Sequence, residues 1–236
     1  VPLTKKNAGI LAAIFSVCGL TQLSTLFLFG EQRVWELYPL LVHALLGILL
    51  YTLLLFVELM AGKLRLKTES VALCLLSGLV MPFFFTALIR ILMRPSGKWL
   101  LFIPFLMAFL SDTGAYFVGI SIGKHKMAPV ISPKKSWEGF FGGIATAVAG
   151  MLLFGWILEY VNIFEVRYGV ILLYGLLGSL GAVMGDLTMS VIKRQVGIKD
   201  YGNLIPGHGG ILDRFDSVMI TAVLTEALLM VIPFMV

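Results

Sequence analysis

Long apolar stretches separated by short polar segments dominate the pattern of hydrophobic and polar positions along this chain. Each stretch has about 20 residues, enough to cross the hydrocarbon core of a bilayer as an α-helix. The stretches are continuous and lack the period-two alternation of a membrane strand. Only helices and closed barrels span membranes, so the pattern predicts about seven transmembrane helices. The predicted spans are Ala8–Phe29, Tyr38–Met60, Val71–Leu92, Trp99–Ile120, Phe140–Tyr160, Tyr168–Met189 and Ser217–Val236.

The overall composition also indicates a membrane protein. Hydrophobic residues make up 59% of the 236 positions and charged residues only 13%, and the mean hydropathy is +0.98. A soluble domain carries charge at roughly a quarter of its positions, so lipid must be the solvent for most of this surface. We therefore predict an all-α integral membrane protein, a polytopic transmembrane helix bundle. Residues 1–98 would form its N-terminal helices and residues 99–236 its C-terminal catalytic region.

The basic residues predict how this bundle is oriented. Lys and Arg outnumber Asp and Glu by 18 to 13, but they lie between the spans, so nucleic acid is not expected as a partner. With the N-terminus inside the cell, most of the 18 basic residues fall on the cytosolic side, in line with the positive-inside bias. Two long polar loops, Ser121–Glu138 and Ser190–Asp216, fall on that side and are predicted to wall a site. We expect the inner (plasma) membrane of a bacterium, with the active site facing the cytosol.

Small residues at every fourth position predict close helix packing in the C-terminal half. Gly139, Gly143 and Ala147 form one such series, and Gly181 and Gly185 form another. This spacing lets helix backbones approach closely, so we interpret both series as structural.

Ionisable residues inside apolar spans are costly and are therefore candidates for function. Six lie within or near the ends of the predicted spans: His43, Glu58, Asp112, Glu159, Asp186 and Glu226. Asp112 lies in a Ser-Asp-Thr-Gly segment, and Asp186 shares one helical stripe with Ser190 and Lys193. We predict functional roles for these two aspartates and structural roles for His43, Glu58 and Glu159. Glu226 lies in the middle of its span and needs a partner that the sequence does not identify.

The second polar loop has the residues best suited to phosphates and a metal ion. Its four cations for phosphate oxygens are Lys193, Arg194, Lys199 and Arg214. Its glycines at positions 207, 209 and 210 let backbone amides approach an anion. Asp213 and Asp216 face one direction at the start of the final helix and offer oxygen ligands that suit Mg²⁺. An interfacial anchor for anionic headgroups is the alternative, but it would not need alternating charges or a His between glycines.

The first polar loop ends in Ser-Pro-Lys-Lys-Ser-Trp-Glu-Gly, residues 132–139. Hydroxyl groups beside Lys134 and Lys135, leading into a helix N-terminus, are typical of a phosphate clamp. A simple positive-inside loop would look similar, and the first loop alone does not decide between them. Its pairing with the second loop favours the phosphate clamp.

Ser190–Asp216 resembles the signature of the phosphatidate cytidylyltransferases, the CDP-diacylglycerol synthases. The pattern is S-x-I-K-R-x₄-K-D-x-G-x₂-I-P-x-H-G-G-I-x-D-R-F-D, and this chain matches it at every specified position. Ser132–Gly139 and Ser111–Gly114 also resemble upstream motifs of that family. Its members usually begin with additional apolar sequence carrying a Glu near a span end, which is not found here, so we expect a trimmed N-terminus.

The resemblance implies that a phosphate oxygen of phosphatidic acid attacks the α-phosphorus of CTP and that pyrophosphate leaves. It also implies Mg²⁺, as one or two divalent ions with a monovalent cation as a further option, held by Asp186 and Asp213. Catalytic or orienting roles are expected for Asp112, Lys193, Asp216 and His208. Substrate-binding roles are expected for Ser132, Lys134, Lys135, Ser190, Arg194, Lys199, Asp200, Gly209, Gly210 and Arg214.

The expected partners are CTP, phosphatidic acid and membrane lipid, and a homodimer is one assembly that the sequence allows. A related enzyme that uses CTP on another lipid, such as a polyprenol kinase, is disfavoured by the full signature. The CDP-alcohol phosphotransferases are disfavoured because their D-G-x₂-A-R-x₈-G-x₃-D-x₃-D pattern is missing. A transporter with a cation path through Asp112, Asp186 and Glu226 would often show repeated halves, and no repeat is evident.

Overall fold

The computed structural model describes residues 80–202, 210 and 212–235 of the chain. The first two predicted spans, and the roles predicted for His43, Glu58, His208 and Gly209, lie outside these residues. The chain divides into two compact units, Val1–Ile89 and Arg90–Val236. The candidate site described below belongs to the second unit.

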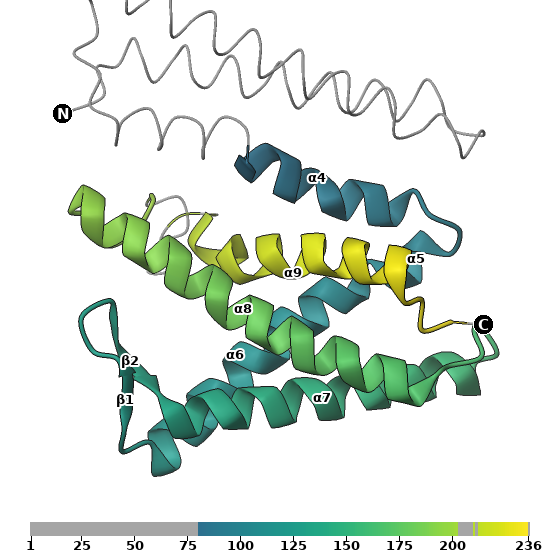
Figure 1. Ribbon diagram of the computed structural model, residues 1–236, viewed down its shortest axis with the longest axis horizontal. Coiled ribbons are helices and arrows are strands. Elements are labelled where there is room, and N and C mark those ends of the chain that lie inside the picture. The colour runs from purple at the N-terminus through teal and green to yellow at the C-terminus, as the bar shows by residue number, and fades with distance from the viewer. Residues whose placement is uncertain (1–79, 203–209, 211, 236) are drawn as a thin grey trace, which may run out of the picture. The chain divides into compact units, whose positions relative to one another are not determined.

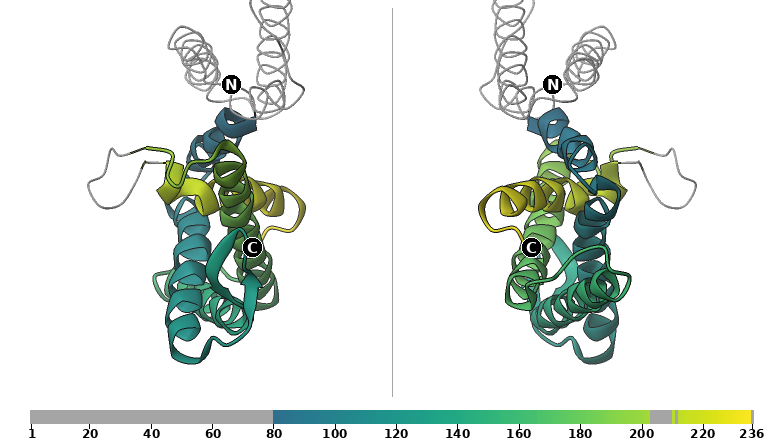
Figure 2. Two further views of the ribbon diagram at one scale, coloured as in Figure 1. Left: turned by 90° about the vertical axis from the view of Figure 1, so that its left-hand side faces the viewer. Right: turned by 90° about the vertical axis from the view of Figure 1, so that its right-hand side faces the viewer.

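The described residues are mostly helical, with one short β-hairpin (Figure 1). The elements in chain order are α4 (Met81–Leu92), α5 (Gly97–Leu100), α6 (Phe102–Ile122), β1 (Lys126–Ala128), β2 (Ser132–Ser136), α7 (Trp137–Tyr160), α8 (Tyr168–Val196) and α9 (Leu212–Val231). The end of α6, the hairpin, the start of α7 and the end of α8 lie together at the left of Figure 1, where α9 also begins. The left view of Figure 2 looks onto this end, which we call the site end.

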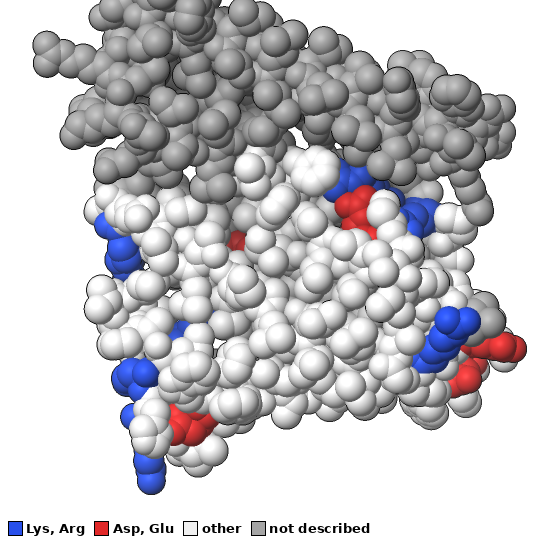
Figure 3. Space-filling model, in the orientation of Figure 1, with Lys and Arg blue, Asp and Glu red and all other residues white. Residues whose placement is uncertain are grey.

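Three described helical segments are long and apolar enough to cross a membrane: Gly97–Ile122, Trp137–Tyr160 and Tyr168–Gln195. They correspond to the predicted spans Trp99–Ile120, Phe140–Tyr160 and Tyr168–Met189. On the face shown in Figure 3, charged residues are concentrated toward the two ends, and the broad middle is almost free of charge. Long apolar helices with charges at their ends are what a bilayer requires. The complete set of seven spans stays a prediction.

The last predicted span, Ser217–Val236, is placed differently in the structure. Helix α9 begins earlier, at Leu212, and ends at Val231. Pro233 follows two residues later, where a ring without an N–H prevents the helix from continuing. Helix α9 has Asp213, Arg214, Asp216 and Glu226 along its length, and it is not among the three membrane-crossing candidates.

The predicted end of the sixth span at Met189 is wrong, because α8 continues to Val196. The polarity of the residues from Ser190 onward predicts a loop, but in the structure they extend the helix beyond its apolar part. Gly197 ends the helix with φ of 75°, a left-handed conformation that glycine adopts without steric cost. The extension keeps Asp186, Ser190 and Lys193 on one helical stripe.

The first polar loop is not irregular, so the all-α prediction needs a small correction. Strands β1 and β2 pair antiparallel, with Lys126 opposite Ser136 and Ala128 opposite Ser132. The turn contains Pro129, which cannot donate a ladder hydrogen bond. Ser136 then caps α7, because its hydroxyl accepts a hydrogen bond from the Gly139 N–H at 3.2 Å.

The predicted series of small residues lie where helices approach one another. A Cβ atom on Gly143 would come within 2.6 Å of the Ser111 carbonyl oxygen on α6, and one on Gly139 within 2.7 Å of the Ala115 carbonyl oxygen. A Cβ on Gly185 of α8 would come within 2.8 Å of the Asp216 carbonyl oxygen on α9. Close contact of α6 with α7 and of α8 with α9 therefore depends on these glycines.

Candidate active site

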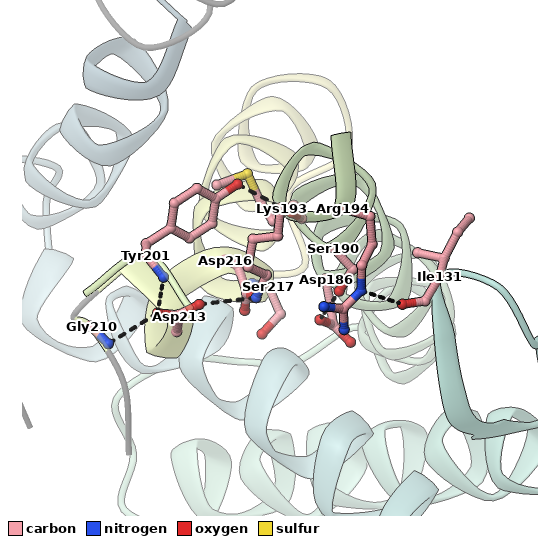
Figure 4. Close-up of polar contacts among 11 residues, drawn as sticks. Ile131, Asp186, Ser190, Lys193, Arg194, Tyr201, Gly210, Asp213, Asp216 and Ser217 are labelled. Atoms are coloured by element: carbon pink, nitrogen blue, oxygen red, sulfur yellow. Dashed lines mark hydrogen bonds and ion pairs between the residues drawn. The ribbon is translucent and has the colours of Figure 1, made fainter. Parts of the chain in front are cut away.

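The polar residues predicted to act together come from four elements at the site end: β2, α6, α8 and α9. Figure 4 shows the part of this site that joins the end of α8 to the start of α9. Most of its polar groups are paired with one another, and some of these pairs link different elements.

Helix α8 presents Asp186, Ser190 and Lys193 on successive turns. The Ser190 hydroxyl donates a hydrogen bond to Oδ1 of Asp186 at 3.3 Å. One turn further, the Lys193 ammonium donates to Oδ1 of Asp213 on α9 at 2.9 Å. The Lys193 and Asp213 side chains are only 11% and 5% exposed. A pair this well shielded from water is strengthened by the low local dielectric, so it ties α8 firmly to α9.

Asp213 also organises the chain on both sides of the glycine-rich segment. Its Oδ2 accepts hydrogen bonds from the N–H groups of Tyr201 at 2.8 Å and Gly210 at 3.0 Å (Figure 4). Burial acts to raise the pKa of Asp213, but the hydrogen bonds from Lys193, Gly210 and Tyr201 outweigh it and hold the pKa below its ordinary value. The carboxylate is therefore ionised at neutral pH and fixed by three donors.

Tyr201 is a site residue that the sequence analysis missed. Its hydroxyl donates to the Met189 carbonyl oxygen at 3.1 Å, and the Lys193 ammonium lies 5.4 Å from the centre of its ring. Burial, together with the negative charge of Asp213, raises the pKa of Tyr201 to about 12, so the phenol stays protonated. Tyr201 occupies an unspecified position between Asp200 and Gly202 in the signature, and that is why the motif did not identify it.

The hairpin contributes Lys135 to the site and turns Lys134 away. The Lys135 ammonium lies 2.6 Å from Oδ2 of Asp186, and both side chains are largely shielded. Lys134 is exposed, because neighbouring residues of a strand point to opposite sides. The two lysines of the predicted phosphate clamp therefore differ in position. Further along the hairpin, Arg194 of α8 donates to the Ile131 carbonyl oxygen at 3.4 Å.

Asp112 of α6 and Asp216 of α9 meet at Ser217. The Ser217 hydroxyl donates to Oδ2 of Asp112 at 3.1 Å, and its N–H donates to Oδ1 of Asp216 at 2.8 Å. Asp216 is buried, with only 6% of its surface exposed. The carboxylate of Asp186 is close enough to interact electrostatically with both. Three carboxyl groups thus interact with one another and with Lys135 or Lys193, and a nearby cation favours the ionised form of a carboxyl group.

The remaining predicted site residues lie around this centre. Gly210 is buried and bonds to Asp213, Ser190 is buried beside Asp186, and Ser132 pairs with Ala128 in the hairpin. Three charged residues are exposed to solvent: Lys199, Asp200 and Arg214. They flank the segment that contains His208 and Gly209.

The predicted metal ligands are carboxylate oxygens, those of Asp186 and Asp213. Among the described residues, no group of three or more His, Cys, Asp or Glu side chains is gathered closely enough to hold a metal ion. The predicted metal ligands Asp186 and Asp213 have different lysine partners. Their carboxylate oxygens are nevertheless the donors that Mg²⁺ prefers, and Mg²⁺ usually keeps water molecules and substrate phosphates as its other ligands. The donor set fits such an ion.

Two other acidic residues of the predicted spans have structural partners. Glu226 accepts two hydrogen bonds of 2.6 Å from Arg90, and the two side chains are 11% and 10% exposed. Glu159 accepts a hydrogen bond from the Tyr168 hydroxyl. The partner of Glu226 that the sequence left open is therefore Arg90. A bidentate ion pair at Glu226 also weighs against a cation path through that residue.

The sequence of this chain matches the model of the cytidylyltransferase family over residues 3–232. The chain belongs to that family. Its similar relatives include the phosphatidate cytidylyltransferases of Staphylococcus aureus strain COL, with 40% identity over 172 residues, and of Staphylococcus haemolyticus, with 38% over 172 residues. The enzyme of the same name from Staphylococcus epidermidis is 39% identical over 173 residues. Each match covers 71% of this chain but only 62% of the relative's length.

Family membership confirms the resemblance that the sequence analysis drew from Ser190–Asp216. Lys135 and Lys193 are held close to the carboxylates of Asp186 and Asp213. The site therefore has cations of the kind that bind phosphates and carboxylates of the kind that bind a metal ion.

Proposed function

We propose that this chain transfers a cytidylyl group from CTP to phosphatidic acid, giving CDP-diacylglycerol and pyrophosphate. Two ion pairs at the site end, Lys135–Asp186 and Lys193–Asp213, are the observation that supports this most. Family membership supplies the cytidylyl chemistry. The relatives named phosphatidate cytidylyltransferase suggest the lipid acceptor.

In the proposed reaction a phosphate oxygen of phosphatidic acid forms a bond to the α-phosphorus of CTP. The bond between that phosphorus and the bridging oxygen breaks, and pyrophosphate takes the electron pair. The attacking phosphate monoester is already anionic at neutral pH, so no general base is required. The main task of the protein is to hold two anions together in line, which depends on positioning and on positive charge.

The lysines would serve this task by exchanging partners. In the structure the ammonium groups of Lys135 and Lys193 rest against carboxylates. A substrate phosphate offers the same lysines an alternative charge-assisted contact. Arg194 at the end of α8 and the exposed residues Lys199 and Arg214 would bind the outer phosphates, and Asp112 and Asp216 would orient the substrates.

We propose that Asp186 and Asp213 hold Mg²⁺ once the substrates bind. The ion would neutralise phosphate charge near the α-phosphorus; one or two divalent ions, with a monovalent cation in addition, would suit the excess of carboxylates. Asp213 is already fixed by Lys193, Tyr201 and Gly210, so it needs little rearrangement to serve as a ligand.

We also propose that the site end faces the cytosol, where CTP is available, in the inner membrane of a bacterium. Three observations support this location: the positive-inside bias of the sequence, the three helices long enough to cross a membrane, and the bacterial relatives. CTP would then approach from the cytosol and phosphatidic acid from the lipid, at the level where α6, α7 and α8 meet the hairpin.

The test is pyrophosphate release by the purified chain in liposomes, with CTP and phosphatidic acid supplied separately and together. Release should require both substrates and a divalent cation, and EDTA should abolish it. The Asp186→Asn variant, checked for folding by thermal unfolding in detergent, is the matched control and should be inactive. Release with diacylglycerol or polyprenol in place of phosphatidic acid would instead assign the chain to another lipid substrate.

A further inference from the structure

The hairpin has an exposed surface that the proposed reaction does not use. Val130, in the turn between β1 and β2, is 88% exposed, although it is a large hydrophobic residue. The lysines around it, Lys124, Lys126 and Lys134, are exposed as well. We call these four residues the hairpin surface. An apolar tip surrounded by cations is the pattern of a segment that rests on an anionic membrane.

The position of the hairpin in the fold places this surface at the edge of the apolar spans. The hairpin connects α6 to α7, two of the three membrane-crossing candidates. Ile122, at the end of α6, is 60% exposed, and Trp137, at the start of α7, is 47% exposed. Aromatic residues such as Trp are enriched where a membrane helix passes through the headgroup layer. The hairpin surface therefore begins at the level of the lipid headgroups.

The hairpin is held in a fixed orientation at both of its ends. At its base, Glu138 accepts hydrogen bonds from the N–H and the ring of His125. Toward its tip, Arg194 of α8 donates to the Ile131 carbonyl oxygen. Lys135 points to Asp186 while Lys134 points outward, so the strand separates its site-facing lysine from its surface-facing one.

We propose that the hairpin surface docks onto anionic lipid headgroups of the membrane that holds this chain. Val130 enters the headgroup layer, and the three lysines contact lipid phosphates or carboxylates outside the reaction site. The proposal rests on the proposed function in one respect, since it requires the site end to lie at a bilayer surface. Each lysine near an anionic surface strengthens docking roughly fivefold, an effect that salt screens.

The test is a fluorescent probe on the hairpin tip of the 236-residue chain. Cys18 and Cys74 are replaced by Ser, and a single Val130→Cys variant is labelled with a polarity-sensitive dye. The labelled protein is placed in nanodiscs of phosphatidylcholine, with or without phosphatidylglycerol. We expect a blue-shifted emission and weaker quenching by aqueous iodide when phosphatidylglycerol is present, and we expect high salt to reverse both changes.

The matched variants identify the residues responsible. The double variant Lys124→Gln, Lys126→Gln neutralises two of the lysines. In this variant the change in dye emission and in iodide quenching on adding phosphatidylglycerol should be at least tenfold smaller. Lys98→Gln, on the exposed α5 lysine far along the chain from the hairpin, should leave the response unchanged. Equal quenching by iodide of the dye at position 130 in both kinds of nanodisc would overturn the proposal. A response to phosphatidylglycerol that is unchanged by the Lys124 and Lys126 substitutions would overturn it as well.

This readout does not depend on catalysis, so it separates two kinds of failure. If the chain released no pyrophosphate from CTP and phosphatidic acid but the dye still responded to phosphatidylglycerol, the proposed function would fail and the docking surface would stand. If turnover were normal but the dye did not respond, the docking surface would fail alone.

Discussion

The Lys135 ammonium lies 2.6 Å from Oδ2 of Asp186 and joins the hairpin to the middle of the site. The neighbouring Lys134 is exposed on the other side of the strand. Two adjacent lysines of one motif therefore have different environments. A phosphate bound near Asp186 would contact Lys135, whereas Lys134 would remain in solvent or at lipid headgroups.

This difference predicts unequal effects of the same substitution. Lys135→Ala should lower kcat/KM by about 100-fold, because it removes the ammonium partner of the Asp186 carboxylate and takes a cation out of a shielded site. Lys134→Ala, the matched control, should change kcat/KM by only a few-fold, as an exposed charge does. Steady-state kinetics with CTP and phosphatidic acid varied in turn would measure both. Equal losses in the two variants would contradict the assigned orientations.

The ring of Tyr201 should contribute more to kcat/KM than its hydroxyl does. Tyr201→Phe removes only the hydrogen bond to the Met189 carbonyl oxygen, and a loss of about 1 kcal/mol, or fivefold in kcat/KM, is expected. Tyr201→Ala also removes the ring beside Lys193 and should be far more damaging. KM for CTP is the informative quantity, because Tyr201 flanks the glycine-rich segment. A Phe variant as impaired as the Ala variant would show that the hydroxyl, not the ring, is what matters.

The ion pair between Arg90 and Glu226 should stabilise the fold without taking part in the reaction. Arg90→Ala or Glu226→Ala should each destabilise the protein by about 3 kcal/mol, because either change breaks an ion pair that is well shielded from water. The double Ala variant should lose less than the sum of the two. Thermal unfolding in detergent, with kcat measured below the transition, would test this. Strictly additive losses would mean that the two residues do not stabilise each other.

Gly143 and Gly169 offer a matched test of helix packing. An added Cβ at Gly143 would lie 2.6 Å from the Ser111 carbonyl oxygen, whereas nothing lies within 4 Å of one at Gly169. Gly143→Ala should therefore destabilise the protein by about 2 kcal/mol, since α6 and α7 must move apart. Gly169→Ala, near the start of α8, should be neutral or slightly stabilising. Similar unfolding temperatures for the two variants would argue against close packing at Gly143.

Some of this structure follows from the sequence and some does not. The helices containing residues 99–120, 140–160 and 168–189 were predictable because each has a long apolar run. The hairpin was not, because Lys126–Ser136 is short, charged and without alternation of apolar and polar residues. The end of α8 was misplaced because Ser190–Val196 is polar and resembles a loop. The length of an apolar run indicates which part of a helix crosses lipid. It does not indicate where the helix ends once its residues become polar.

In the candidate site, too, local sequence spacing predicts some contacts and does not predict others. The stripe of Asp186, Ser190 and Lys193 could be predicted, since its residues are one turn apart on one helix. The contact of Asp112 with Ser217 joins residues 105 apart in the chain, and no local spacing indicates it. The same holds for Arg90 and Glu226, 136 residues apart. Local patterns identify which residues have a function, and only the packed structure shows how they are paired.

Cytidylyl transfer itself is tested most directly by following two labels of CTP through the reaction. The purified chain in liposomes with phosphatidic acid is given CTP labelled with ³²P at either the α- or the γ-phosphate. We predict that the α-label appears in the lipid and that the γ-label appears in pyrophosphate, with Asp186→Asn producing neither. A γ-label in the lipid would show a kinase, and an α-label that never enters lipid would contradict the proposed function.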